Sequence, residues 1–255
     1  MLRGLDHVVI LVPDLDEAVE SYTRLGFTVV PGGRHNVATE NALIAFEDGS
    51  YLELIAFWED APQHRWHRYL RLGGGLVDYC MRTSDLANDV AQLRAAGIAM
   101  SEKEPMSRLR PDGYRVEWAL SLATETQGVT PFLIEDITPR EERVPRQVEH
   151  ANGVTGISTI TIAVRDLDVA RRVASVLGDA PPVEAGDMPQ RGARYMSGGH
   201  ALEFILPGAD PEIADFLSGR QGEGGVFVLS LKTTGPQTTI EPSQAHNARL
   251  TMVHA

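Results

Sequence analysis

The chain has 255 residues, of which 43% are hydrophobic and 23% charged, which predicts a globular protein with a sizeable core rather than a disordered chain. Its 35 acidic and 23 basic residues give a formal net charge of -12, which disfavours binding to a nucleic-acid backbone. The single cysteine excludes an internal disulfide and a Cys-rich zinc module. No apolar run reaches the roughly 20 residues of a membrane span, and the first residues lack a signal-peptide pattern. We therefore expect a cytoplasmic protein without a membrane or nucleic-acid partner.

One pattern occurs three times along the chain: an apolar run, an Asp-Leu pair and an amphipathic stretch closed by glycine. The Asp and the Gly are 12 residues apart in every copy, at 14 and 26, 85 and 97, and 166 and 178. The apolar run predicts a buried strand. The Asp is expected to cap a helix, and the Gly to end it.

Strands are expected after each of these helices, at 27–30, 41–46 and 51–57, at 98–101, 114–122 and 130–137, and at 182–184, 193–196 and 201–206. The module is therefore β-α-β-β-β, repeated three times. The tail has strand patterns at 226–232 and 249–253 with no helix pattern between them, and we interpret it as a truncated fourth copy. Segment 138–151, a charge run between two prolines, is the expected domain boundary, and segment 207–224 is a surface connection with room for one helical turn.

Several segments resemble the vicinal oxygen chelate superfamily. Residues 5–16 (LDHVVILVPDLD) are similar to its first strand and helix start, and residues 51–55 (YLELI) to its fourth strand. Residues 32–35 (GGRH) followed by 39–46 (TENALIAF) resemble its glyoxalase-like domain branch. The resemblance is close over residues 4–60 and looser to about 137.

The resemblance implies an α+β fold, in which repeated βαβββ modules pair into open, cup-shaped mixed sheets. Residues 1–140 would form a glyoxalase-like domain of two modules. Residues 150–255 would hold the third module and the truncated fourth, as a degenerate second pair.

In that superfamily the metal ligands come from the first and fourth strands of each module. The resemblance therefore points to His7 and Glu53 and, 71 residues beyond His7, to Asp78 as ligands of a divalent ion. One imidazole and two carboxylates suit Mg²⁺ or Mn²⁺, with Zn²⁺ also open. They do not match the two-His-one-carboxylate triad of non-haem iron oxygenases, so a dioxygenase is less expected. The third copy has Thr159 and Glu203 at these positions, and we expect no metal there.

His7 and Glu53 lie in otherwise apolar strands, where a charge is costly unless it is paired or bound. Two interpretations stay open: a divalent-metal site, or a buried hydrogen bond between the imidazole and the carboxylate. Without a metal, a His7 placed between two acids should have a raised pKa.

Three further polar residues are candidate substrate contacts. His35 and Asn41 follow a Gly-rich turn and are expected at the mouth of the cup, although a solvated loop or a turn cap explains them equally well. Glu135 is a candidate fourth ligand or substrate contact, with Leu133 as the alternative in the other strand register. The basic, aromatic run 63–71 (QHRWHRYLR) either steers an anionic substrate or is a solvated helix face.

These residues, with the resemblance, predict metal-assisted carbonyl chemistry on a small oxygenated molecule. A substrate with neighbouring oxygens would chelate the ion, and Glu53 or Asp78 would move a proton through an enolate-type intermediate, as in a lyase or isomerase. The alternative is a non-catalytic cup that sequesters a small molecule against its tryptophans. A third alternative is that the paired modules serve only a homodimer.

Overall fold

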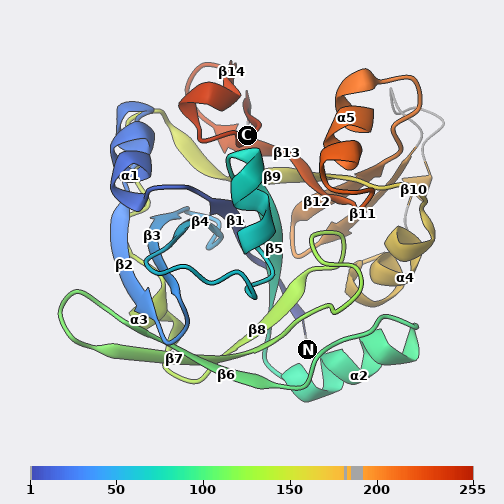
Figure 1. The fold of residues 1–255 in the computed structure, drawn as a ribbon, viewed down its shortest axis with the longest axis horizontal. Coiled ribbons are helices and arrows are strands. Elements are labelled where there is room, and N and C mark those ends of the chain that lie inside the picture. Colours follow the sequence, from blue (N-terminus) through green and yellow to red (C-terminus); the bar gives the residue numbers. More distant parts are fainter. Residues whose placement is uncertain (1, 181–182, 185–191, 255) are drawn as a thin grey trace.

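The computed structural model describes residues 2–180, 183–184 and 192–254 of the chain. The described residues form two sheets, one from each half of the sequence (Figure 1). The first is a closed barrel with strand order β1-β4-β3-β2-β6-β7-β8-β5, and the second is an open sheet with order β10-β11-β12-β9-β13-β15-β14. The predicted α+β fold of repeated modules is confirmed, and the expected cup of the first half closes into a barrel.

Two βαβββ modules build the barrel. The first contains β1 (Leu2–Leu11), α1 (Leu15–Arg24), β2 (Val30–His35), β3 (Thr39–Ala45) and β4 (Tyr51–Phe57). The second contains β5 (Gly75–Thr83), α2 (Leu86–Ala95), β6 (Glu104–Leu109), β7 (Arg115–Ser121) and β8 (Phe132–Asp136). The 3₁₀ helix η1 (His67–Leu72) joins the modules, and the short helix α3 (Arg140–Arg143) follows the second.

Two antiparallel seams join the modules into a closed cylinder. One seam pairs β1 with β5 over most of their length, and His7 lies opposite Cys80 there. The other pairs β2 with β6, where His35 lies opposite Arg108. Closure by this second seam brings polar residues of both modules to one side of the barrel interior.

The first two helices begin and end as predicted. Asp14 accepts a hydrogen bond from the backbone N–H of Glu17 at 2.9 Å, and Asp85 does the same for Asn88 at 3.2 Å. Gly26 and Gly97 follow these helices in the left-handed conformation, at φ +86° and +77°. At the third helix, α4 (Asp168–Leu177), Asp166 accepts a hydrogen bond from the backbone N–H of Asp168 at 3.0 Å, although the N-cap position itself is Leu167, and Gly178 follows the helix at φ -79° rather than in the left-handed conformation.

Three sequence predictions of local structure were wrong. The strand expected at 27–30 begins only at its last residue, because β2 covers Val30–His35. The expected strand at 98–101 is only an isolated bridge at Met100, and the strand of that module is β6. Pro105 and the lack of alternation hid β6, which is held by pairing with β7 and β2 rather than by its own pattern. In segment 207–224 the chain forms the nine-residue helix α5 (Pro211–Gly219), longer than the single turn expected.

The second sheet is built from the third module and the tail. It contains β9 (Val154–Ala163), β10 (Val183–Glu184), β11 (Gly192–Ser197), β12 (His200–Ile205), β13 (Gly225–Thr233), β14 (Thr238–Ile240) and β15 (Leu250–His254), with the 3₁₀ helix η2 (Pro242–Gln244) before β15. The tail has three strands, β13, β14 and β15, where a full module has four, and, as predicted, no α-helix lies between β13 and β15. Residue 182 of the predicted strand 182–184 lies outside the described residues.

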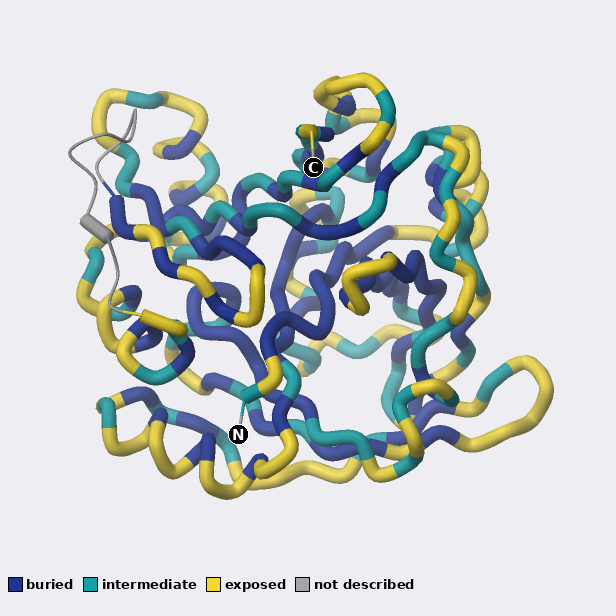
Figure 2. Tube along the Cα trace, turned by 180° about the vertical axis from the view of Figure 1, so that it is seen from behind, coloured by how far each residue is buried: buried dark blue, intermediate teal, exposed yellow. Residues whose placement is uncertain are grey.

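The two sheets pack against each other through β5 and β13, and the largest hydrophobic cluster includes residues of both halves (Figure 2). Half-buried polar contacts also cross this junction: Asp48 accepts a hydrogen bond from the backbone N–H of Ile157 at 2.9 Å and pairs with His200 at 3.3 Å. The barrel is therefore supported on one side by the second sheet. Among the described residues, no helix is long and apolar enough to cross a membrane.

The triple glycine before β5 suggests a test of the β1–β5 corner. Gly74 has φ +81°, and a methyl group added to it would lie 2.2 Å from the carbonyl oxygen of Leu11. Gly113 has nearly the same φ, +82°, with nothing within 4 Å of the added atom. We expect Gly113→Ala to lower the free energy of unfolding by about 1–2 kcal/mol, through backbone strain alone. Gly74→Ala should cost about 1–3 kcal/mol more because of the added clash.

Urea denaturation of the two variants measures this difference. Equal losses of stability in both would mean that the β1–β5 corner is not as tightly packed as the structure has it.

Candidate active site

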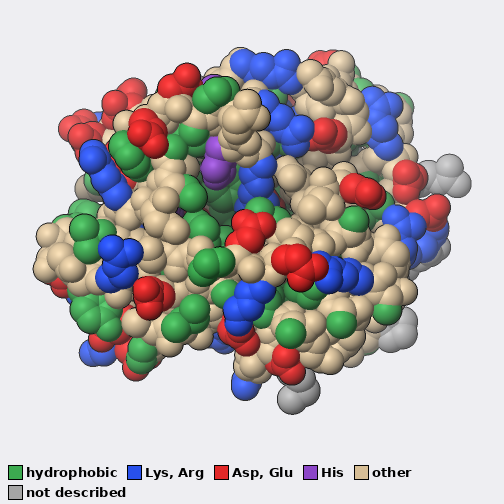
Figure 3. Space-filling view, turned by 60° about the horizontal axis from the view of Figure 1, so that its bottom comes forward, with side chains coloured by type: hydrophobic (Ala, Val, Ile, Leu, Met, Phe, Trp, Pro, Cys, Tyr) green, Lys and Arg blue, Asp and Glu red, His purple; other side chains and the backbone are tan. Residues whose placement is uncertain are grey.

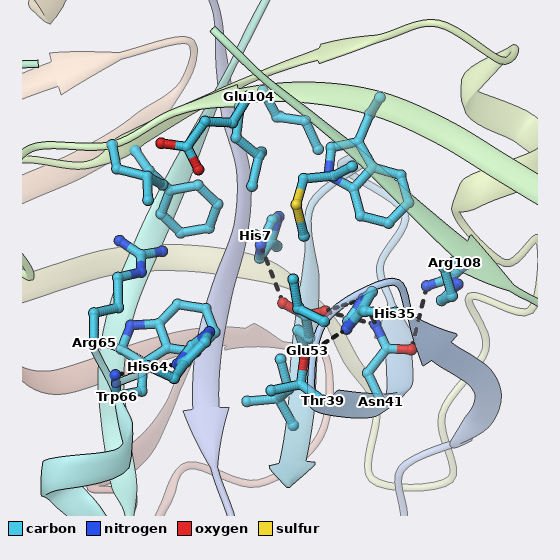
Figure 4. Close-up of a pocket in the computed structure, with 18 of the residues that line it drawn as sticks. His7, His35, Thr39, Asn41, Glu53, His64, Arg65, Trp66, Glu104 and Arg108 are labelled. Carbon is cyan, nitrogen blue, oxygen red and sulfur yellow. Dashed lines mark hydrogen bonds and ion pairs between the residues drawn. The ribbon is translucent and has the colours of Figure 1, made fainter. Parts of the chain in front are cut away.

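The barrel encloses a cavity of about 320 Å³, near the small end of the range found for ligand pockets, about 300–1,000 Å³. One part of its wall is apolar, and is formed by Ile55, Met106, Trp118, Leu120, Leu122, Phe132 and Ile134. Polar side chains gather in another part, and are those of His7, His35, Thr39, Asn41, Glu53, Arg108 and Arg143 (Figure 4). Figure 3 shows a hollow with a histidine in it and a basic side chain beside it. The cavity can therefore hold a molecule that is apolar on one side and polar on the other.

Glu53 is the centre of the polar part. Its Oε2 lies 3.4 Å from Nε2 of His7, and its Oε1 accepts a hydrogen bond from Nδ2 of Asn41 at 2.5 Å. Nε2 of His35 lies 3.8 Å from the same Oε1. Burial alone would raise the pKa of Glu53, but the hydrogen bond and charge of His7, followed by His35 and Asn41, lower it to about 2. Glu53 is therefore a buried carboxylate that stays ionised.

His7 is held between Glu53 and its own chain neighbour. Its Nδ1 lies 2.8 Å from Oδ1 of Asp6, at a point where β1 has an irregularity in its pairing with β5. Its ring stacks on Tyr51 with centroids 4.6 Å apart. Burial lowers the pKa of His7, but the hydrogen bonds to Asp6 and Glu53 outweigh it and the pKa is raised. The second acid beside His7 is therefore Asp6, and not the Asp78 expected from the repeat.

Asp6 is completely buried and is compensated by two arginines from the segment after β8. Arg143 donates to both of its oxygens, at 2.9 and 3.0 Å, and Arg140 forms a further ion pair. Arg143 also contacts Asp136 at 2.5 Å and the hydroxyl of Tyr51 at 2.7 Å. Burial raises the pKa of Asp6, but Arg143, His7 and Arg140 together bring it well below its ordinary value. Sequence reasoning missed Asp6 and Arg143, although Asp6 was visible as a second charge in an apolar strand.

The structure places His35 and Asn41 inside the cavity, beside Glu53. Nδ1 of His35 lies 2.9 Å from the hydroxyl of Thr39, and its Nε2 faces the amide of Asn41 at 3.4 Å. Burial is the main cause that lowers the pKa of His35 to about 4, with Arg108 and His7 acting in the same direction against Glu53. His35 is therefore a neutral imidazole at pH 7, whereas the pKa of the His7 imidazole on the other side of Glu53 is raised.

Asp78 and Glu135 do not join this group. Asp78 pairs with Arg65 at 2.8 Å and accepts a hydrogen bond from Nε1 of Trp66 at 3.2 Å, outside the cavity lining. Glu135 pairs with Lys103 at 2.6 Å and accepts from the backbone N–H of Leu86 at 3.3 Å, so it faces α2 outside the barrel. In the β1–β5 register Asp78 lies opposite Val9, and Cys80 lies opposite His7. Asp78 is therefore two residue pairs removed from His7, where Arg65 and Trp66 hold it.

The basic run 63–71 is divided between two environments. Residues 63–66 line the cavity, and 67–72 form η1. The guanidinium of Arg65 lies over the rings of Trp66 and Phe132, at 4.4 and 4.7 Å from their centroids. The first part of the run is therefore cavity wall rather than a solvated helix face.

One group of three potential metal ligands is found among the described residues: ligand atoms of Asp6, His7 and Cys80 all lie within 4.8 Å of one another. Asp6 is already bound by two arginines, and burial raises the pKa of the Cys80 thiol. His7, His35 and Glu53 do not meet the same distance criterion, so they do not form a two-His-one-carboxylate triad as they stand.

The cavity side of His7 fits a metal better. Nε2 of His7 and Oε2 of Glu53 are 3.4 Å apart, and an imidazole nitrogen and a carboxylate oxygen are both ligands that would hold a divalent ion. Asp6 on the opposite ring nitrogen is the outer carboxylate that commonly orients a metal-binding imidazole. His7 and Glu53 thus fit two ligand positions of a divalent ion, and the remaining positions would face the cavity.

Comparisons with known proteins agree with this fold. The model of a glyoxalase-like domain matches residues 5–177. A hypothetical protein from Staphylococcus aureus superposes over 100% of both chains with a TM-score of 0.76 and 14% identity. No curated protein sequence matches the chain.

Two other solved structures share part of the architecture. A xylose isomerase-like TIM barrel/4-hydroxyphenylpyruvate dioxygenase fusion protein matches 91% of this chain and 36% of its own, with a TM-score of 0.54 and 18% identity. A mutant of 4-hydroxymandelate synthase from Streptomyces coelicolor matches 91% of this chain and 72% of its own, with a TM-score of 0.57 and 16% identity. At these identities the likeness shows the fold alone, and the family-model match over residues 5–177 is what confirms the resemblance to a glyoxalase-like domain.

The compensation of Asp6 gives a stability prediction. Arg143→Met removes a guanidinium that is 2% exposed and leaves a buried carboxylate short of its main partner, so we expect a loss of about 3–5 kcal/mol in the free energy of unfolding. Arg140→Met is the matched control, because Arg140 pairs with the same carboxylate from a more exposed position and should cost clearly less. Adding Asp6→Asn to Arg143→Met should recover part of the loss.

Urea denaturation of the single and double variants measures the coupling between the two residues. Strictly additive effects would contradict a direct dependence of Asp6 on Arg143.

Proposed function

Because the chain belongs to the glyoxalase-like domain family, we propose that it is a divalent-metal-dependent lyase or isomerase acting on a small oxygenated molecule. The observation that carries the proposal is the buried His7–Glu53 pair, 3.4 Å apart, in the wall of the cavity. A charged pair placed there has a cost in stability that binding or catalysis explains better than folding does.

His7 and Glu53 would hold the ion, which when bound acts as a Lewis acid toward a substrate oxygen. Asp6 fixes one proton of His7 on Nδ1 and leaves Nε2 to face Glu53 and the cavity. Asn41 donates to Oε1 of Glu53 and so sets the orientation of that carboxylate.

Proton transfer falls to Glu53 and His35. Glu53 is ionised and can take a proton from a carbon next to a carbonyl, which gives an enolate-type intermediate. His35 is neutral and lies 3.8 Å from the same carboxylate, so it can exchange a proton with it. The apolar wall around Trp118 and Phe132 keeps water from these groups. In this proposal Asp78 fixes Arg65 and is not the base.

The alternative function is a cavity that retains a small molecule without turnover. One observation favours it: both oxygens of Glu53 already have partners among the protein's own side chains. The aromatic rings of Trp66, Trp118 and Phe132 would then supply stacking surface.

Metal content separates the two functions. We expect protein purified without chelator to carry about one divalent ion per chain, and His7→Ala and Glu53→Ala to lose it, because each removes one of two ligands. His64→Ala is the matched control: His64 also lines the cavity, with its pKa lowered to about 4 mainly by burial, but it lies outside the His7–Glu53 pair and should leave the ion bound. Elemental analysis of the four proteins gives the answer.

Exchange of carbon-bound hydrogen in deuterated water tests turnover directly. The metal-loaded wild type should exchange the hydrogens next to the carbonyl of small oxo compounds, and Glu53→Gln should lose this activity. A metal-free wild type that binds these compounds without exchange would overturn the enzyme and support the binding protein.

A further inference from the structure

The polar part of the cavity includes a cation for which the protein supplies no carboxylate. Arg108, on β6, is 3% exposed and lines the cavity. Its Nη2 donates to the backbone oxygen of Arg143 at 2.8 Å, and its Nη1 approaches Oδ1 of Asn41 at 3.4 Å. Its Nε is buried without any hydrogen-bond partner. A guanidinium has five N–H donors and does not lose its charge in a protein, so this one is undersatisfied.

The other cations around the cavity are each matched by an acid. Arg65 pairs with Asp78 at 2.8 Å, and Arg143 pairs with Asp6 at 2.9 Å. His7 lies between Asp6 and Glu53. Among the cavity-lining residues that the structure describes, Arg108 is the cation left without an acid within 4.0 Å.

The position of Arg108 relates it to the reacting groups. Asn41 contacts Arg108 through its oxygen and Glu53 through its nitrogen, so the guanidinium and the carboxylate flank one amide (Figure 4). A ligand oxyanion bound by Arg108 would therefore have its adjoining carbons near Glu53. The apolar wall, including Trp118 and Met106, is left for the rest of the molecule.

We propose that the cavity binds a small monocarboxylate with an apolar or aromatic body, and that Arg108 is the residue that pairs with its carboxylate. This inference rests on the proposed function in one respect, that this cavity is the functional site. It adds the class of substrate that the site binds. A buried guanidinium forms strong, charge-assisted hydrogen bonds to a carboxylate and prefers it to a neutral amide of the same shape. The net charge of -12 repels anions from the surface as a whole, so selection for an anion has to come from within the cavity.

Isosteric pairs of ligands test the proposal on the full chain. Benzoate and benzamide, and phenylacetate and phenylacetamide, differ in charge but hardly in shape. We expect calorimetric titration in the presence of a chelator to show at least about tenfold tighter binding of each carboxylate than of its amide. Arg108→Gln should bring the ratio close to one by weakening the carboxylate alone.

Arg110→Gln is the matched control, with the same chemical change two residues away. Arg110 pairs with Asp112 and Glu142 on an outer groove that Arg108 also borders, and it does not line the cavity. This variant should keep the wild-type ratio. If Arg110→Gln rather than Arg108→Gln abolished the preference for carboxylate over amide, the anion would bind in the outer groove, and the proposal would be overturned.

Arg108 also holds the backbone of Arg143, so Arg108→Gln has the potential to impair folding. In that case Arg108→Lys decides, because an ammonium keeps the charge but not the planar pair of donors, and carboxylate affinity should fall severalfold while amide affinity stays. Equal binding of carboxylate and amide by the wild type, binding of none of the four compounds at millimolar concentration, or an unchanged ratio in both Arg108 variants overturns the proposal. These measurements use metal-free protein and involve no turnover. A negative binding result would therefore not contradict the proposed lyase or isomerase activity, and absence of that activity would not contradict a positive binding result.

Discussion

The architecture of the site depends on the stabilisation of one completely buried carboxylate, that of Asp6. Arg143 and Arg140, in the segment after β8, form ion pairs with this carboxylate. Asp6 can therefore stay buried and hold His7 through its contact with Nδ1 of the imidazole. His7 in turn keeps Glu53 ionised in an apolar barrel. From the arginines through Asp6 and His7 to Glu53, each group has an ion-pair or hydrogen-bond partner in the next, and these contacts lower the desolvation cost of the series.

Barrel closure determines which residues surround this chain of charges. An open cup would leave β2 and β6 as edges, and His35 and Arg108 would then face solvent. The β2–β6 seam instead places them opposite each other in the barrel wall, and both are buried. The low pKa of His35 and the unmatched charge of Arg108 are consequences of that burial. The second sheet packs on the β1–β5 side, which leaves the β2–β6 side free of it (Figure 1).

Sequence patterns were sufficient for the modules and for one polar pair. The capping aspartates and the apolar runs are local signals, and the structure has helices and strands where they predict them. His7 and Glu53 could be paired because both are charges in apolar strands at positions that the resemblance aligns. Asp78 was predicted as a ligand from a constant offset along the chain, and an offset takes no account of which side chain a residue pairs with. In the structure it pairs with Arg65, from the crossover between the modules, and lies outside the cavity lining. Arg108 and Arg143 could not be singled out, because each lies in a segment whose composition looks like ordinary surface and only the closed barrel buries it.

The two modules of the barrel have diverged into different chemical roles. The first supplies the polar groups around Glu53, on β1, β2, β3 and β4: His7, His35, Asn41 and Glu53 itself. The second supplies Trp118 and Phe132 for the apolar wall, together with Arg108. If both modules carried the same acidic half-site, their like charges would face each other within one cavity of about 320 Å³, and their repulsion would have a high electrostatic cost. Apart from the exposed Glu104 at the start of β6, the second module lines the cavity mainly with apolar side chains and one buried guanidinium. Under the proposals above, this difference between the modules would orient a small molecule with one charged end, with that end at Arg108 and its apolar body along the opposite wall.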